Sequence, residues 1–138
     1  MMIDMDSPNR YYTPGNFHGK SYYFTNQEFH NLCPPCDISD MQFGVIYFLD
    51  DLRAYMGKPV LVTSAYRTKE WELSKGRSGT SSHCKGLAVD IACPDDVYRL
   101  KVLYFLFRNP LVCNRVGIGK NFIHVDFDTS KKPAVWVY

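Results

Sequence analysis

The sequence lacks any long run of apolar residues. Its strongest apolar run, Val102 to Phe107, is six residues long, whereas a helix needs about 20 apolar residues to cross a membrane. No basic segment followed by a sustained apolar stretch opens the chain, and a Sec-type signal requires such a segment. We therefore expect a soluble protein that is made in the cytoplasm without a signal peptide and does not insert into membranes.

A strong excess of one charge is also lacking. The chain has 16 Lys and Arg residues against 14 Asp and Glu residues, and its basic residues are scattered. Proteins that follow a phosphate backbone carry dense basic patches, so nucleic acid is not an expected partner. A hydrophobic content of 46% and a length of 138 residues are typical of a globular chain with one core.

The cysteines do not form a set that could pair completely. There are five, and an odd number does not suit a disulfide framework. The segment Cys33-Pro34-Pro35-Cys36 is compatible with a disulfide, a redox pair or half of a structural zinc site, and reduced thiols are the alternative. A structural site would need two more ligands, but no second CxxC exists among Cys84, Cys93 and Cys113.

The chain divides into an arm and one domain. Residues 1–20 mix Pro, Gly, Asn and Tyr without periodicity and predict an extended N-terminal arm. Residues 21–138 form the predicted domain. A short helical turn is expected after Thr25 or Asn26, each of which can act as an N-cap.

The clearest helix is predicted from about Asp40 to Met56. Ser39 and Gln42 have the spacing of a capping box at its start, and Gly57 supplies a C-terminal stop. Polar residues such as Asp50 are expected to face solvent. The core-facing stripe consists of apolar residues spaced three to four apart: Val45, Leu49, Leu52 and Met56.

Short apolar segments predict a small sheet. A second helix is expected over residues 95–108, and a long loop over 75–82. The predicted strands cover residues 60–64, 87–91, 116–119, 122–127 and 134–137, the last at an edge. Because strands cluster around two helices, the sequence predicts an α+β fold: a small, mainly antiparallel sheet with flanking helices and the functional site on the sheet.

One histidine and one carboxylate mark a candidate metal site. His83 lies in a polar stretch, and Asp90 follows seven residues later between Val89 and Ile91. A carboxylate in an apolar strand needs compensation. Either a divalent cation or a salt bridge to Arg67 could provide it.

A second segment adds to this site. His124 and Asp126 are two residues apart on a predicted strand, so their side chains project from the same face. Two imidazoles and one carboxylate leave the fourth tetrahedral position of zinc open, as in catalytic rather than structural sites. Cys84, His18 and His30 are expected to pack or face solvent rather than bind metal.

These residues carry a family resemblance. The segment from residue 81 to 90 matches the signature Ser-x-His-x-x-Gly-x-Ala-x-Asp of the zinc D-alanyl-D-alanine carboxypeptidase family, which the chain resembles from about residue 24 to 127. Residues 63–68 are similar to the family segment Ser-Gly-Tyr-Arg-Ser, with Ala65 in place of glycine. Residues 122–126 resemble the last ligand strand of the subgroup ending in His-Val-Asp.

The resemblance implies roles for individual residues. His83, Asp90 and His124 would bind Zn²⁺, and Arg67 would contact the substrate or transition state, unless it only pairs with a carboxylate. We expect Ser81 and Tyr66 in substrate binding, although Tyr66 could simply pack. Many relatives have an acid or histidine where this chain has Asn121, which cannot accept a proton. Asp126 is then the candidate general base, or alternatively an outer partner of a ligand imidazole or a surface carboxylate.

The resemblance also implies a function. We expect a monomeric zinc peptidase that cuts a bond next to a D-amino acid in peptidoglycan stem peptides. Similar short chains are encoded by bacteriophages, so a lysis or entry enzyme made in the host cytoplasm is expected, acting on the wall after release. Two alternatives are a catalytically silent zinc module that binds cell wall or a protein, and a virion component with the metal as a structural element.

Overall fold

The computed structural model describes residues 9–108 and 111–138 and contains a five-stranded sheet. Strand order is β1-β2-β4-β3-β5, and only the β3–β5 pair is parallel. The strands are β1 (Val62–Ser64), β2 (Ala88–Ala92), β3 (Arg115–Ile118), β4 (Phe122–Asp126) and β5 (Ala134–Val137). The predicted α+β fold with a mainly antiparallel sheet is confirmed.

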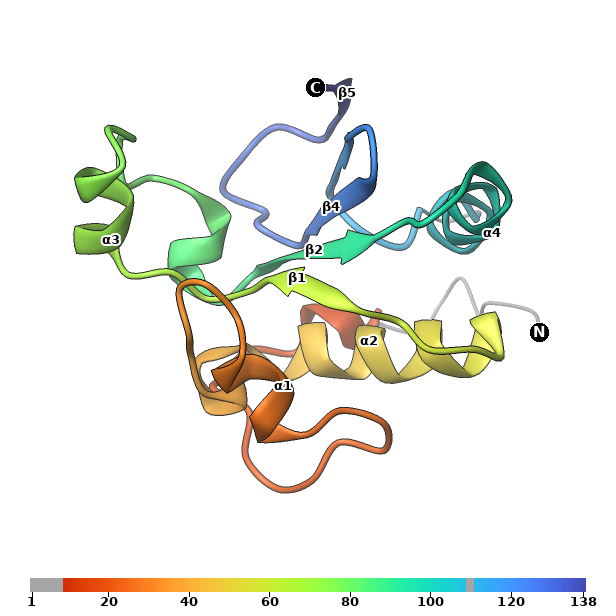
Figure 1. Ribbon diagram of the computed structural model, residues 1–138, viewed down its shortest axis with the longest axis horizontal. Helices are drawn as coiled ribbons and strands as arrows, with labels where there is room; N and C mark the ends of the chain where they lie inside the picture. Colours follow the sequence, from red (N-terminus) through yellow and green to blue (C-terminus); the bar gives the residue numbers. More distant parts are fainter. Residues whose placement is uncertain (1–8, 109–110) are drawn as a thin grey trace.

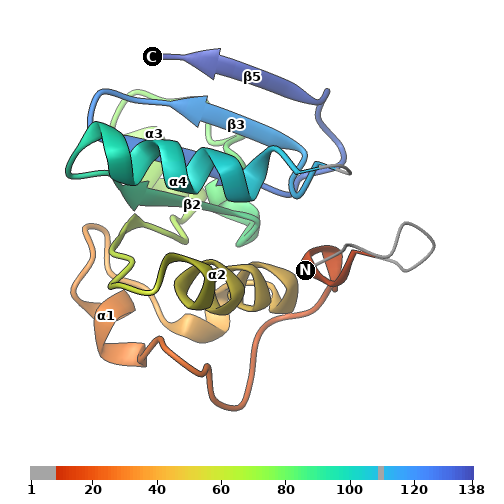
Figure 2. The same cartoon turned by 90° about the vertical axis from the view of Figure 1, so that its right-hand side faces the viewer.

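The two faces of the sheet have different environments. In Figure 2, α4 (Asp96–Leu106) lies in front of the sheet and α3 (Lys69–Ser74) behind it. Because side chains alternate along a strand, every second residue joins the core beneath α4 and α2 (Phe43–Met56). These core residues are Val89, Ile91, Val116, Ile123 and Val125. The side chains of the intervening residues point to the opposite face of the sheet.

Helix α2 ends as predicted but begins later (Figure 1). Gly57 ends the helix in the left-handed conformation, with φ +68°. The predicted start at Asp40 is wrong, because Asp40 belongs to a separate 3-10 turn, η2 (Ile38–Asp40). The backbone between turn and helix is held extended by two hydrogen bonds: Phe17 donates to the Met41 carbonyl, and Gln42 donates to the Gly86 carbonyl.

Asp50 does not face solvent, contrary to the prediction. Its carboxylate is buried on α2 and accepts hydrogen bonds from Ser21 Oγ and from the backbone N–H groups of Tyr22 and Tyr23. Three donors compensate the burial of this charge. Asp50 therefore ties the segment before α1 to the main helix.

The remaining helices are short. Helix α1 (Asn26–His30) has the expected N-cap at Thr25, which forms a capping box with Glu28, and α4 begins after its N-cap Asp95. Helix α3 and the 3-10 turn η3 (Ser82–Lys85) were not predicted. In the described ranges, no helix combines the length and apolar character needed to span a membrane.

The N-terminal segment lies against α2. Residues 1–8 of the predicted arm lie outside the described residues. Beyond them, a 3-10 turn, η1 (Arg10–Tyr12), and the buried ring of Phe17 contact the core. A Cβ at Gly44 would lie 1.9 Å from the Tyr11 carbonyl oxygen, so glycine permits this close approach.

Candidate metal centre

A single row of residues crosses the sheet on the face away from α4. The register pairs Ser64 with Asp90, Asp90 with His124, His124 with Gly117, and Gly117 with Trp136. Residues directly opposite each other on neighbouring strands share a face. The fold therefore brings Asp90 and His124 together, although they are 34 positions apart in the sequence.

The turn η3 brings the third residue of the group, His83, to the same place. Ser81 caps this turn by accepting a hydrogen bond from the His83 N–H, and Gly86 ends it in the left-handed conformation. His83 Nδ1 lies 2.7 Å from the Ala65 carbonyl oxygen. Because a carbonyl can only accept, Nδ1 carries the proton and Nε2 is left as the potential metal donor. Nε2 lies 3.3 Å from Asp90 Oδ1.

Three ligand atoms converge in this way. His124 Nδ1 lies 2.9 Å from Asp90 Oδ1, and the donor atoms of His83, Asp90 and His124 all lie within 4.8 Å of one another. Ligand atoms at the corners of a tetrahedron with bonds of about 2.0 Å are about 3.3 Å apart. The chemistry and spacing of this set fit zinc, and within residues 9–108 and 111–138 it is the one such group.

The electrostatics of the group favour a cation. Burial raises the pKa of Asp90, but hydrogen bonds with His124 and His83 outweigh that effect, so the pKa of this carboxyl lies well below its usual value. Burial lowers the pKa of His124, but Asp126 and Asp90 outweigh it and the pKa rises. Two carboxylates thus stabilise positive charge between them, and a metal ion would satisfy the same requirement.

Asp126 lies on the far side of the His124 ring from Asp90. Its Oδ2 is 2.8 Å from His124 Nε2 and 3.4 Å from Arg115 Nε, and the residue is buried. A carboxylate bound to the outer nitrogen of a ligand histidine fixes the orientation of the ring. Of the roles predicted for Asp126, this placement favours that of an outer partner of His124 over that of a general base.

Arg67 lies beside the group, held by two neighbours. Its Nη2 is 3.7 Å from Asp90 Oδ2, Nε and Nη2 donate to Ser64 Oγ, and Nη1 donates to Glu72 Oε1 at 3.2 Å. Glu72, on α3, is only 1% exposed and also accepts from Arg77 Nη1 at 3.2 Å. Asp90 is therefore only one of three partners of Arg67, and Ser64 and Glu72 orient the guanidinium.

An open groove of about 450 Å³ borders the group. Asp90, Arg67 and Asn121 line it, so the groove reaches one of the three candidate metal ligands. Tyr66 and Ser81 are not among its lining residues: Tyr66 packs against the core and Ser81 caps η3. The other lining residues are Cys33, Thr63, Ser64, Trp71, Arg77, Ala92 and Phe122.

Sequence reasoning missed several residues around the group. Trp136 packs its ring 5.5 Å from that of His124, and a Cβ at Gly117 would lie 2.7 Å from the Trp136 ring. Glycine at position 117 thus lets the edge strand β5 cover the group with an aromatic side chain. Glu72, Trp71 and Arg77 were missed because no spacing signal links them to Arg67.

The cysteines and the other histidines take no part in the group. All five cysteines are free thiols, so the CPPC segment forms no disulfide here. Cys36 is buried, which raises its pKa to about 11, whereas Cys33 is exposed. His30 pairs with Asp37, and His18 contacts the Phe43 ring.

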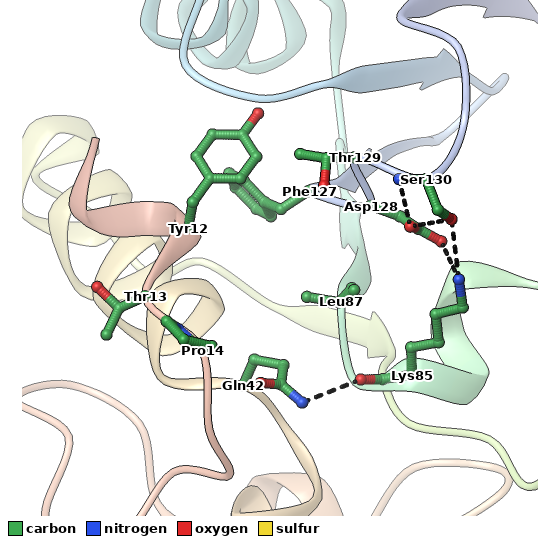
Figure 3. A pocket seen from close by; sticks show the side chains of 10 residues that line it. All are labelled: Tyr12, Thr13, Pro14, Gln42, Lys85, Leu87, Phe127, Asp128, Thr129 and Ser130. Atoms are coloured by element: carbon green, nitrogen blue, oxygen red, sulfur yellow. Dashed lines mark hydrogen bonds and ion pairs between the residues drawn. The ribbon is translucent and has the colours of Figure 1, made fainter. Parts of the chain in front are cut away.

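A second hollow of about 380 Å³ lies between the N-terminal segment and the chain after β4 (Figure 3). Lys85 Nζ lies 3.0 Å from both Asp128 Oδ2 and Ser130 Oγ. Burial raises the pKa of Asp128, but bonds from Ser130 and Lys85 outweigh it and lower the pKa to about 2. Tyr12, Leu87 and Phe127 supply apolar lining.

A family model agrees with this geometry. The model described as Peptidase M15 matches residues 23–126, a segment that contains His83, Asp90, His124 and Arg67. No individual curated protein matches the chain. The family consists of zinc-dependent metallopeptidases that act on peptides containing D-amino acids. The match covers most of the chain and ends on β4, two residues after the last candidate ligand, and the chain therefore belongs to the peptidase M15 family.

Proposed function

We propose that the protein is a zinc peptidase that hydrolyses a peptide bond next to a D-amino acid in peptidoglycan stem peptides or cross-links. The observation that carries the proposal is the convergence of donor atoms from His83, Asp90 and His124 beside an open groove. Three ligands leave room for a substrate or water on a tetrahedral metal. When bound, zinc supplies Lewis acidity, which polarises a carbonyl and lowers the pKa of a water molecule.

Arg67 has the placement expected of a group that stabilises negative charge on the reacting carbonyl oxygen. Its guanidinium lines the groove beside Asp90 and is already oriented by Ser64 and Glu72. Donors that are preorganised before the reaction stabilise the transition state most effectively. We therefore assign Arg67 the oxyanion contact.

Asp126 and Ser81 act through the ligands in this proposal. Asp126 holds the His124 ring so that Nδ1 faces Asp90, and Ser81 holds the turn that presents His83. Loss of such outer partners ordinarily weakens metal binding by about 10–100-fold. Both residues are positioning residues here rather than substrate contacts.

The test is digestion of purified peptidoglycan by the zinc-loaded protein, with products identified by mass spectrometry. We expect new stem-peptide fragments from the intact protein and none from His83→Ala. Fragment masses would identify the bond and separate a carboxypeptidase from an endopeptidase. Absence of fragments from an intact protein that retains about one zinc per chain would contradict hydrolysis of this substrate.

A zinc-containing binding module is the second candidate. Asn121 lines the groove, and Asp90 is the only carboxylate among the lining residues. Because Asp90 is a candidate metal ligand, the lining residues include no second carboxylate that could act as a general base. This candidate predicts that the zinc-loaded protein sediments with peptidoglycan sacculi but leaves them intact. Release of fragments would eliminate it.

We also propose that the protein acts as a monomeric lysis or entry enzyme of a bacteriophage. The support is its resemblance to short phage-encoded chains. Size-exclusion chromatography with light scattering tests the monomer. Lysis from within, measured on bacteria that express the protein with and without a holin, tests whether it reaches the wall after release.

A further inference from the structure

The groove is lined by a second arginine, Arg77, to which the proposed peptidase mechanism assigns no role. Arg77 lies after α3 and lines the same groove as Arg67 and Asp90. Its side chain is 51% exposed. The two arginines share one buried partner, since Glu72 accepts from Arg67 through Oε1 and from Arg77 through Oε2, each at 3.2 Å.

Arg77 is oriented although it is exposed. Its guanidinium carbon lies 5.2 Å from the centroid of the Trp71 ring, its Nη1 donates to Glu72, and its backbone N–H donates to the Glu72 carbonyl at 3.0 Å. An arginine held on one edge by a carboxylate and on one face by an aromatic ring keeps its remaining donors in a defined direction. Those donors are available to the groove.

The charge of the groove favours an anion. Its charged lining residues are Arg67, Arg77 and Asp90, and the charge of Asp90 would be used by a metal ion. The single carboxylate of Glu72 is shared between two guanidiniums and is buried behind them. The groove therefore presents net positive charge to a ligand, and a planar carboxylate matches the donor fork of arginine.

We propose that Arg77 is a specificity-determining residue that binds a free carboxylate of the substrate, while Arg67 contacts the reacting carbonyl. Glu72 sets the spacing between the two guanidiniums. The proposal rests on the proposed peptidase function and narrows it, because it selects a substrate with a free carboxylate close to the cut bond. A peptide that ends in D-Ala-D-Ala carries such a group at its C terminus.

The test compares an N-acetylated tripeptide ending in D-Ala-D-Ala with its C-terminal amide. We expect the intact protein to prefer the acid, and Arg77→Gln to lose about 10–100-fold in kcat/KM on the acid, chiefly through KM, since hydrogen bonds to charged groups have this magnitude. On the amide the change should stay below about threefold. Arg77→Lys should restore part of the loss, because it keeps the charge but not the fork.

Lys75→Gln is the matched control. Lys75 also lies over the Trp71 ring, with Nζ 5.5 Å from its centroid, but it does not line the groove. This variant should retain the preference for the acid. An equal loss on acid and amide in Arg77→Gln would overturn the proposal, because a merely structural role would affect both. A third peptide, with an amidated C terminus and a D-Glu side chain, separates a side-chain carboxylate from a terminal one.

Binding measurements separate this proposal from the peptidase function. If no peptide is cleaved, titration calorimetry of the zinc-loaded protein with the same peptides measures the acid preference directly. Preference for the acid that is lost in Arg77→Gln would support the carboxylate site while hydrolysis fails. Equal binding of acid and amide by the intact protein would overturn it, whatever the result for turnover.

Discussion

Two hollows of similar size differ in the chemistry of the polar groups beside them. The groove of about 450 Å³ is lined by Asp90, whose carboxylate belongs to a group of three potential metal ligands with His83 and His124. In the hollow of about 380 Å³ near Tyr12, Lys85, Asp128 and Ser130 are bonded to one another. Volume does not distinguish the two regions. Two imidazoles and a carboxylate can together bind a metal ion and so indicate a reactive site, whereas a bonded Lys, Asp and Ser stabilise the fold.

Removal of one of the three candidate metal ligands should affect activity most. His83→Ala should abolish zinc binding and reduce hydrolysis by at least about 1,000-fold, because two remaining ligands hold the metal poorly and its Lewis acidity is lost. Zinc content by mass spectrometry and peptidoglycan digestion measure both effects. Chelation of the intact protein should reproduce the loss, and added zinc should reverse it. Full activity in the chelated protein would contradict the metal assignment.

The next largest effect is expected at Glu72. Glu72→Gln leaves two guanidiniums without their buried partner, so we expect a loss of about 3 kcal/mol in unfolding free energy and about 10–100-fold in kcat. Chemical denaturation and steady-state kinetics measure these values. The exposed Glu70 on the same helix is the control, and Glu70→Gln should change neither. An unaltered kcat in Glu72→Gln would show that Arg67 does not depend on it.

Asp126 affects the metal site through His124, because it contacts the ring nitrogen that faces away from Asp90. Asp126→Asn should weaken zinc binding by about 10–100-fold, because the amide holds the imidazole less firmly. Competition with a chelator measures the zinc dissociation constant. If zinc affinity is unchanged while the acidic limb of the pH–rate profile disappears, Asp126 acts as the general base instead.

The smallest effect on activity is expected in the second hollow. Asp128→Asn should cost about 1–3 kcal/mol in unfolding free energy at neutral pH, because it weakens bonds to Lys85 and Ser130. Since the folded pKa of Asp128 is lowered to about 2 from an ordinary 3.8, its contribution is present above about pH 4 and is lost as the pH falls towards 2.

Denaturation at several pH values checks this. The stability difference between Asp128→Asn and the intact protein should narrow below about pH 4, while zinc content stays unchanged at neutral pH. A difference that is constant with pH would contradict a role for the ionised carboxylate. Loss of zinc in this variant would show that the two hollows are coupled.

The sequence was informative where the signal is local. The spacing of His83 and Asp90 and the position of His124 in an apolar strand suggested a metal site, and the match to the family signature assigned these three residues as its ligands. Short apolar segments located all five strands to within about two residues. The end of α2 at Gly57 was also predicted correctly, because a left-handed C-cap favours glycine at one position whatever the rest of the fold.

Prediction failed where distant contacts decide the conformation. Ser39 and Gln42 have the spacing of a capping box, but hydrogen bonds to Phe17 and Gly86 hold the backbone after Asp40 extended. Asp50 has the spacing of a solvent-exposed residue, but it is buried by the segment at Ser21.

Residue type, spacing and the family resemblance indicated the candidate metal ligands, and the period of a strand placed His124 and Asp126 on one face of the sheet. The nitrogen of each histidine that faces Asp90 depends on tertiary contacts. The Ala65 carbonyl orients the His83 ring, and Asp126 orients the His124 ring. The tertiary structure alone also joined Arg67 and Arg77 through Glu72. The physical reason is that ligand type and strand period are properties of short segments, whereas the partners of a buried charge are chosen by elements distant in the chain.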